Sequence, residues 1–397
     1  MSKNDSTPTT SPYPSRGPLQ YIPFKISPPL LNSATPWATD TADLSTLYGS
    51  PHTGAVTIRT SLLSGFKQNR DHHQYTFFST VTGHSTAQIK LSEQEGRGEV
   101  KDGETSSLNT FGYSPITFEE YTNILRTFRD SGFLTSDNPF PDKKSRLKPF
   151  VVSVTGSPED IGKCCYDLLC LQNEEESVKS REGSGGLMVM MEINLSCPNI
   201  PEKPPPAYDA ASLYTYLSAV AEAKALFASS HSSAGGIGLH VGIKTPPYTY
   251  SAQFEGLIQA LEKVANDGGR YPLSFITATN TLGSCLVLGE HNISSLGSAN
   301  GMGIGGMAGD ALHPIALGNV KTIRSMLDAS GYQALKAIQL IGVGGVKDKA
   351  GFERMKSVGA AAVGVGTAFG REGVTSFCNI AKVQCNICST KVSINVE

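Results

Sequence analysis

Short apolar segments alternate along the chain with longer stretches in which apolar residues recur every three or four positions. The apolar segments, such as LMVMMEI and IQLIGV, are continuous rather than alternating with polar residues. Strands of a parallel sheet have this composition because both of their faces are buried. The pattern predicts strands at Leu30–Ala34, Ala55–Thr60, Phe150–Thr155, Leu187–Leu195, Ile237–Lys244, Leu273–Asn280, Ile338–Val343 and Ala361–Gly366.

The stretches between these strands have helical spacing. In Asp209–Ala228, for example, apolar residues fall on one face, and Asp209 is suited to cap the first turn. Eight strands alternating with helices predict an α/β fold, a (β/α)8 TIM barrel over residues 23–383, with a doubly wound sheet as the alternative. The other predicted helices are Thr117–Asp130, Ser251–Asn266, His313–Leu327, Lys347–Val358 and Glu372–Val383.

Two connections are much longer than the others. Residues 62–116 are polar and glycine-rich without a strong helical pattern, and residues 283–309 are rich in glycine and serine. Both follow predicted strands, so in a barrel they form long loop insertions at the C-terminal face. That face carries the active site in enzymes of this architecture.

Charge and composition exclude several classes of protein. The net charge is −2 and no long basic run occurs, which argues against a nucleic-acid partner. No stretch of 18 apolar residues predicts a membrane span. Residues 1–22 are rich in Ser, Thr and Pro and resemble neither a signal peptide nor a transit peptide. We expect a disordered tail at 1–22, an irregular tail at 384–397 and a cytoplasmic protein.

The eight cysteines are expected to be reduced thiols, because nothing in the sequence indicates secretion. Cys385 and Cys388 form a CxxC motif without a second pair of ligands, which makes zinc an unfavourable interpretation. His72 and His73 lie in a polar segment and are expected to be solvated rather than metal-bound. We therefore predict no metal site.

Cys197 has the most distinctive context of any cysteine. It lies in INLSCPN, which follows an apolar strand and therefore falls at the mouth of the barrel. A thiol placed there between amide side chains can act as a nucleophile or as a base in proton transfer. From the residues alone, a strand end capped by Asn and Ser is an equally good interpretation.

Polar residues also close the next two strands, with Lys244 after the fifth and Asn280 and Thr281 after the sixth. The ends of successive strands converge on one pocket in a barrel, so these side chains are expected near Cys197. Glycine-rich turns follow the seventh and eighth strands. Bare backbone N–H groups at these turns commonly bind phosphate, which predicts a phosphorylated cofactor.

Taken together, the segments NLSCPN, IKTPPY, TATNTLG, GIGGMAGDALHPIALGNV, IQLIGVGGV and GVGTAFGREG resemble the dihydroorotate dehydrogenases, specifically the soluble, fumarate-using class 1 enzymes. The similarity runs from about residue 20 to residue 383. The resemblance implies FMN-dependent oxidation of (S)-dihydroorotate to orotate in pyrimidine (UMP) biosynthesis, with fumarate as the acceptor and a homodimeric assembly. The membrane-bound class usually has Ser where this chain has Cys197.

The resemblance also implies roles for individual residues. Cys197 would remove the proton from C5 while hydride passes from C6 to the flavin, and Lys244 would stabilise charge on the reduced flavin. Substrate contacts are expected from Arg59, Asn109, Phe111, Gly112, Tyr113, Asn194, Asn199, Asn280 and Thr281. Cofactor contacts are expected from Ala34, Thr35, Arg59, Thr60, Asn194, Lys244, Thr279, Gly305, Gly306, Gly344, Gly345, Gly366 and Thr367.

Three positions depart from the family pattern. Arg59 stands where the family has Lys, Thr35 interrupts a small Ala-Gly turn, and Tyr113 opens a segment that is Leu-Pro-Asn in the family. Arg keeps the charge of Lys but differs in shape and reach. These departures leave two alternatives open: an FMN oxidoreductase acting on another small cyclic substrate, or a non-catalytic flavin-binding protein.

Overall fold

The computed structural model describes residues 24–85, 89–90, 101–134, 147–182, 186–200, 205–231, 238–268 and 271–382. The two predicted tails, and with them the CxxC motif, lie outside these ranges. Within the described ranges, no helix combines the length and apolar character that crossing a membrane requires.

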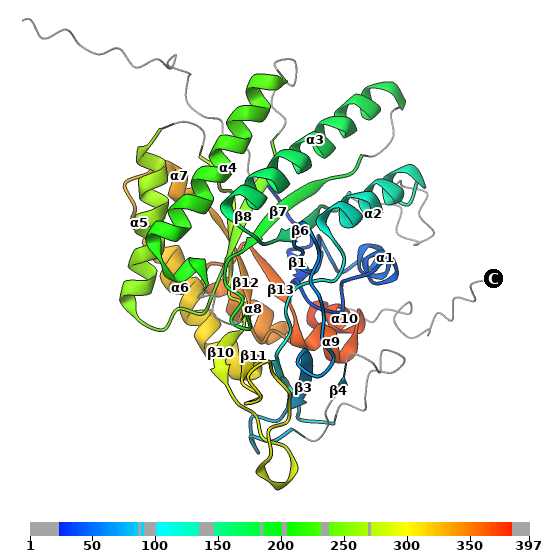
Figure 1. The fold of residues 1–397 in the computed structure, drawn as a ribbon, viewed down its shortest axis with the longest axis vertical. Helices are drawn as coiled ribbons and strands as arrows, with labels where there is room; N and C mark the ends of the chain where they lie inside the picture. The colour runs from blue at the N-terminus through cyan, green and yellow to red at the C-terminus, as the bar shows by residue number, and fades with distance from the viewer. Residues whose placement is uncertain are drawn as a thin grey trace, which may run out of the picture.

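Eight parallel strands form the centre of the molecule, and they confirm the predicted (β/α)8 barrel (Figure 1). A parallel bridge between Leu31 and Ala55 joins the first strand to the segment of the second and completes the ring. Each strand lies within one residue of its predicted range. The strands are β1 (Leu30–Asn32), β2 (Val56–Thr57), β6 (Phe150–Val154), β7 (Val189–Asn194), β8 (His240–Thr245), β9 (Phe275–Ala278), β12 (Gln339–Val343) and β13 (Ala362–Val365).

Helices surround the ring, and most agree with the predicted pattern. The carboxylate of Asp209 accepts from Ser212 N at 2.7 Å, which confirms the predicted cap. The helix predicted at Glu372–Val383 is confirmed over Thr375–Ala381, and Gly373 (φ 63°) separates it from a short preceding helix, Thr367–Glu372, that was not predicted. The helices are α1 (Thr41–Gly49), α2 (Phe118–Asp130), α3 (Pro158–Glu182), α4 (Ala210–Ser230), α5 (Ser251–Asn266), α6 (His313–Ala329), α7 (Gln333–Lys336), α8 (Lys349–Ser357), α9 (Thr367–Glu372) and α10 (Thr375–Ala381), with 3-10 turns η1 (Pro206–Tyr208), η2 (Glu290–Asn292) and η3 (Asp310–Leu312).

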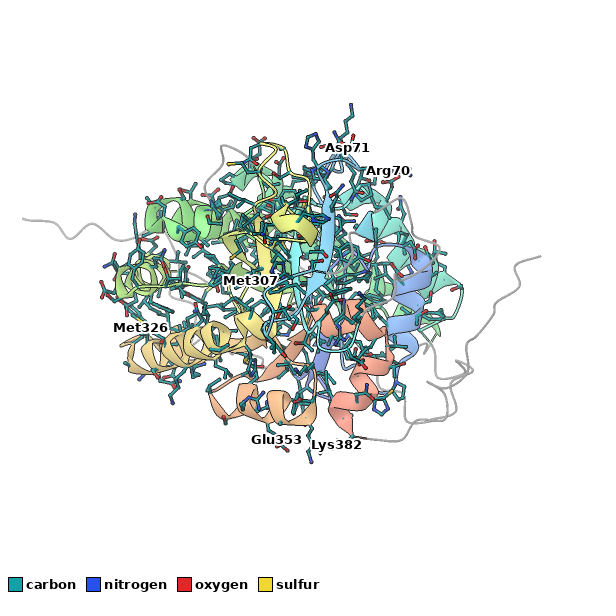
Figure 2. All side chains as sticks on the ribbon, turned by 90° about the horizontal axis from the view of Figure 1, so that it is seen from below. Arg70, Asp71, Met307, Met326, Glu353 and Lys382 are labelled. Carbon is teal, nitrogen blue, oxygen red and sulfur yellow. The ribbon has the colours of Figure 1, made fainter. Side chains whose placement is uncertain are left out.

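A second, antiparallel sheet lies at one end of the barrel, where loops were expected (Figure 1). Its strands come from the two long insertions after β2 and β9, so it covers the carboxyl ends of the barrel strands. Figure 2, seen from this side, shows Met307 of this sheet near the middle of the view. The sheet has the order β10 (Leu282–Cys285), β11 (Gly305–Gly309), β5 (Ser106–Asn109), β3 (Gln74–Phe78) and β4 (Ile89–Lys90).

The buried apolar residues form separate clusters in different regions of the molecule. The largest part lies between the barrel strands and the helices, and includes Leu44, Phe150 and Leu217. A smaller part includes Met190 and Phe275, on β7 and β9. Polar side chains occupy the carboxyl end of the strands instead, so apolar packing at this end gives way to the candidate site.

Candidate active site

One cavity opens at the carboxyl ends of the barrel strands, beneath the antiparallel sheet. Its volume is about 140 Å³, on a scale on which one water molecule needs roughly 10–15 Å³, so it has room for a small-molecule ligand. Its wall is made by residues that follow seven of the eight barrel strands, together with β3, β5, β11 and the segment after β5.

The cavity is electrostatically positive. Arg59 and Lys244 both line it, and both side chains are buried, with 5% and 4% of their surfaces exposed. None of the lining residues in the described part of the chain is Asp or Glu. Burying a cation without a counter-ion is unfavourable, so the cavity is suited to a bound anion.

Cys197 faces this cavity from the turn after β7. Burial raises the pKa of its thiol, and this effect outweighs the backbone N–H of Asn199, the nearby charge of Lys244, the Tyr113 hydroxyl and the charge of Arg59, which all act to lower the pKa. The resting group is therefore a neutral thiol. The same surroundings stabilise the thiolate once the proton has left.

Arg59 lies after β2 and is positioned by its neighbours. Its guanidinium carbon is 5.5 Å from the centroid of the Phe111 ring. With the Gln68 amide oriented so that its oxygen faces the guanidinium, that oxygen accepts from both terminal nitrogens at 3.0 and 2.8 Å. Burial lowers the pKa of Arg59 to about 10, and it remains charged at neutral pH.

The four asparagines of the site form two hydrogen-bonded pairs. Asn199 Nδ2 donates to Asn109 Oδ1 at 3.0 Å and to the Phe111 carbonyl at 2.9 Å. Asn280 Nδ2 donates to Asn194 Oδ1 at 3.1 Å. These bonds fix the amide orientations before a ligand arrives, which reduces the entropy lost on binding.

Some polar groups of the cavity still lack protein partners. The hydroxyls of Thr35 and Thr279 are buried and have no hydrogen-bond partner within the described ranges, while Lys244 Nζ donates to Ser33 Oγ at 3.0 Å. Unpaired buried hydroxyls are uncommon in folded proteins and indicate a missing partner. Both threonines belong to the predicted cofactor set, so a ligand with polar edges fits this part of the wall.

Glycines form the opposite end of the cavity. Gly344 and Gly345 follow β12, and Gly366 follows β13. Gly345 has φ 68°, and a Cβ there would lie 2.6 Å from the Gly309 carbonyl. The turn after β12 therefore requires glycine, and both turns line the cavity, as the predicted phosphate site needs.

The predicted site residues converge on this cavity with two exceptions. Gly305 and Gly306 are not among its lining residues, and both lie on β11. A Cβ on Gly305 would contact the Asn109 carbonyl and one on Gly306 would contact Thr281 Oγ1, so close packing accounts for both glycines. Sequence reasoning missed Ser33, Pro36, Trp37, Tyr75, Ser107, Pro198, Ala308, Gly309, Leu312 and Val343.

The missed residues differ in how they could have been found. Pro36, Trp37 and Pro198 adjoin predicted site residues, so proximity in the sequence was an available signal. Tyr75 and Ser107 lie on β3 and β5, and only the pairing of these strands brings them to the cavity.

No metal centre is found among the described residues. His72 Nδ1 bonds to the Ser298 carbonyl at 2.9 Å, and His73 Nδ1 accepts from Asn69 N at 2.8 Å. Both imidazoles therefore form hydrogen bonds with the backbone of loops.

Comparison with known proteins agrees with this architecture. The family model for dihydroorotate dehydrogenase matches residues 70–384. A protein of Streptococcus equi subsp. equi named "Putative dihydroorotate dehydrogenase A (fumarate)" is 32% identical over 308 residues, covering 77% of this chain and 79% of that protein. A protein of the same name from Streptococcus uberis is 28% identical over 311 residues, covering 77% and 79%. The chain belongs to the dihydroorotate dehydrogenase family of oxidoreductases.

Proposed function

We propose that this protein oxidises (S)-dihydroorotate to orotate with FMN as its redox cofactor and fumarate as its electron acceptor, as a step of pyrimidine (UMP) biosynthesis. The observation that carries the proposal is the composition of the cavity. A thiol, two buried cations, two hydrogen-bonded pairs of asparagines and glycine turns line the same cavity.

The residues of the cavity fit FMN. The unpaired hydroxyls of Thr35 and Thr279 and the ammonium of Lys244 suit the polar edge of a flavin ring. The backbone of Gly344, Gly345, Gly366 and Thr367 suits a phosphate. When bound, FMN accepts the hydride that leaves C6 of the substrate.

The thiol end of the cavity fits dihydroorotate, a small cyclic amide with a carboxylate. The guanidinium of Arg59 offers a planar pair of N–H donors to a carboxylate or carbonyl. The amides of Asn109, Asn194 and Asn280 and the side-chain oxygen of Asn199 offer hydrogen-bonding groups to the ring, since the N–H groups of Asn199 already bond to Asn109 and Phe111. Their mutual hydrogen bonds keep them aligned for one orientation of the ligand.

Cys197 is the proposed base at C5. Because burial raises the pKa of its thiol, the group must first lose a proton, and the charges of Lys244 and Arg59 then stabilise the thiolate. Proton removal at C5 and hydride loss at C6 together create the double bond of orotate. The rate of this step is expected to rise with pH into the alkaline range, because only the thiolate is a competent base.

Fumarate as the acceptor follows from the names of the relatives. A homodimeric assembly follows from the family resemblance.

A second candidate is a paralogue that uses FMN on another small cyclic substrate. Arg59, Thr35 and Tyr113 favour it, because all three depart from the family pattern and all line the cavity. A screen of cyclic amides would support it if another compound reduced the flavin faster than dihydroorotate.

The test separates the cofactor from the substrate. Trp37 is the only tryptophan of the chain and lines the cavity, so bound FMN should quench its fluorescence. Anaerobic addition of dihydroorotate should then bleach the flavin absorbance, and fumarate should restore it. Quenching without bleaching would keep the cofactor and reject the substrate, whereas an absence of quenching would reject both.

A further inference from the structure

A second, smaller cavity adjoins the active-site cavity. It shares three lining residues with the first, namely Tyr113, Asn194 and Cys197, so these residues form the wall between the two. Its volume of about 10 Å³ is at the lower limit for holding one water molecule. The thiol of Cys197 therefore has a candidate site for water beside it that the substrate does not occupy.

Tyr113 connects Cys197 to this second cavity. Tyr113 and Cys197 line both cavities, and Thr155 lines the second cavity alone. The Tyr113 ring is held edge-on by Phe66, with the ring centroids 5.7 Å apart. Hydrogen bonding with Thr155 and with Cys197 is among the causes that set the pKa of Tyr113. A hydroxyl both donates and accepts, so a thiol, a phenol and an alcohol around one small cavity are suited to pass a proton.

The other polar groups of the dividing wall have different partners. Asn194 Nδ2 donates to Thr60 Oγ1 at 3.0 Å, and its Oδ1 accepts from Asn280 and Ser196. An amide also cannot pass a proton without changing its tautomer. In the second cavity, the Tyr216 hydroxyl donates to the Gly156 carbonyl at 2.7 Å. Tyr113 is thus the wall residue suited to proton transfer.

We propose that Tyr113 and Thr155 form a proton relay that carries the proton of the Cys197 thiol away to water, an inference that rests on the proposed function. The S–H bond of Cys197 breaks as its proton moves to Tyr113 Oη. The Tyr113 O–H proton moves to Thr155 Oγ1, and the Thr155 proton moves to water in the second cavity. The relay residues end unchanged, and one proton has left the thiol.

The site requires an exit for the proton of the Cys197 thiol. Burial keeps Cys197 protonated at rest, and after each turnover the thiol holds the proton taken from C5. With substrate and flavin filling the first cavity, that proton requires another exit. Tyr113 stands where the family has Leu, so this path belongs to this chain and is not expected of the family in general.

The first test is Tyr113→Phe, which keeps the ring and removes the hydroxyl. Anaerobic flavin reduction by dihydroorotate should slow by about 10- to 100-fold. Its pH profile should move to higher pH, because the Tyr113 hydroxyl helps to lower the thiol pKa. Tyr248→Phe is the matched control: it loses a buried hydroxyl bonded to the Ala207 carbonyl at 2.7 Å, outside both cavities, and should leave rate and profile unchanged.

A double variant distinguishes a relay from two independent roles. Thr155→Val should slow flavin reduction to a similar extent, and Tyr113→Phe with Thr155→Val should be no slower than Tyr113→Phe alone. Tyr113→Phe with the wild-type rate and pH profile would overturn the proposal, and so would additive losses in the double variant.

The outcome also separates this inference from the proposed function. If wild-type protein is never reduced by dihydroorotate, the function fails. The pH dependence of Cys197 alkylation by iodoacetamide then tests the contact directly, because Tyr113→Phe should shift it to higher pH. An unshifted alkylation profile would exclude the Tyr113–Cys197 coupling whatever the substrate is.

Discussion

The two ends of the barrel each bury cations, but they surround them differently. At the amino end, Lys148 precedes β6, and its ammonium donates to the carbonyls of Tyr48 and Ser50 and to the Thr53 hydroxyl. At the carboxyl end, Lys244 donates to Ser33 Oγ, and Arg59 faces Gln68. Among the described residues, no ion pair with a carboxylate involves any of the three.

The difference indicates which charge serves the fold and which serves a ligand. The Lys148 ammonium donates to backbone carbonyls, and these bonds connect the end of α1 and the segment before β2 to the start of β6. Arg59 and Lys244 line a cavity that contains no acid, and their charge remains available to a bound anion. A buried cation is thus structural at one end of the same barrel and functional at the other.

The largest expected effect comes from removing the Cys197 thiol, which lines the cavity together with Arg59 and Lys244. Cys197→Ala should slow flavin reduction by dihydroorotate by about 10²- to 10⁴-fold, because the base at C5 is lost. FMN should still quench Trp37. Cys285→Ala, a half-buried cysteine outside the cavity, serves as the control in stopped-flow absorbance. Rapid reduction by Cys197→Ala would contradict the assignment.

Replacing each of the two buried lysines in turn tests the comparison between the two ends of the barrel. Lys244→Met should slow flavin reduction by about 10²- to 10³-fold, because an electrostatic stabiliser of the reduced flavin is removed. Its melting temperature should change little or rise, since an unpaired buried charge is gone. Lys148→Met should lower the melting temperature and leave flavin reduction intact. The same phenotype in both variants would refute the division of roles.

The glycine end of the cavity should respond through cofactor affinity rather than chemistry. Gly345→Ala places a Cβ 2.6 Å from the Gly309 carbonyl at φ 68°, so the turn must shift. FMN affinity should fall by about tenfold or more, as measured by quenching of Trp37. Gly331→Ala, where a Cβ meets nothing within 4 Å, should bind FMN normally. Equal affinities would remove this turn from the cofactor site.

Replacing Arg59 with the residue of the family pattern should have a smaller effect. Arg59→Lys keeps the charge but loses the planar pair of donors that face Gln68. KM for dihydroorotate is expected to change by about 2- to 10-fold, which corresponds to the net contribution of one ordinary hydrogen bond. A gain of more than this in kcat/KM would indicate that Arg59 selects a different substrate.

A separate effect, on stability rather than on catalysis, concerns Lys148 and pH. Burial lowers its pKa to about 8, so between pH 8 and 10.5 the unfolded chain holds a proton that the folded protein has released. Stability contributed through this group therefore rises with pH in that window. Wild type should gain about 2 kcal/mol relative to Lys148→Met between pH 7.5 and 9.5. Urea unfolding at several pH values measures this, and parallel pH curves would show that Lys148 keeps its ordinary pKa.

The alternation of apolar runs and helical stretches was sufficient to predict the barrel. Continuous runs such as Val189–Asn194 become strands buried on both faces, and their order along the chain sets their order in the ring. Because all eight strands are parallel, their carboxyl ends meet at one face. Residues such as Lys244 and Asn280 could therefore be assigned to one pocket from their positions after strands.

The antiparallel sheet was not predictable in this way. β11 is GGMAG and β5 is SSLN, and neither has the composition of a strand. They form strands because they pair with each other, Gly306 opposite Asn109, across nearly 200 residues of sequence. The pairing of β3 with β5 and of β5 with β11 brings Tyr75 and Ser107 into the cavity wall.

The sequence by itself determined the barrel and the residues at its mouth, because burial on both faces and strand-end position are local properties of the chain. The tertiary structure decided which of those residues touch. It placed Tyr113 between Cys197 and Thr155, left the hydroxyls of Thr35 and Thr279 unpaired, and gave Lys148 and Lys244 opposite surroundings. Such contacts depend on distances between segments far apart in the chain, which a pattern of apolar and polar positions does not contain.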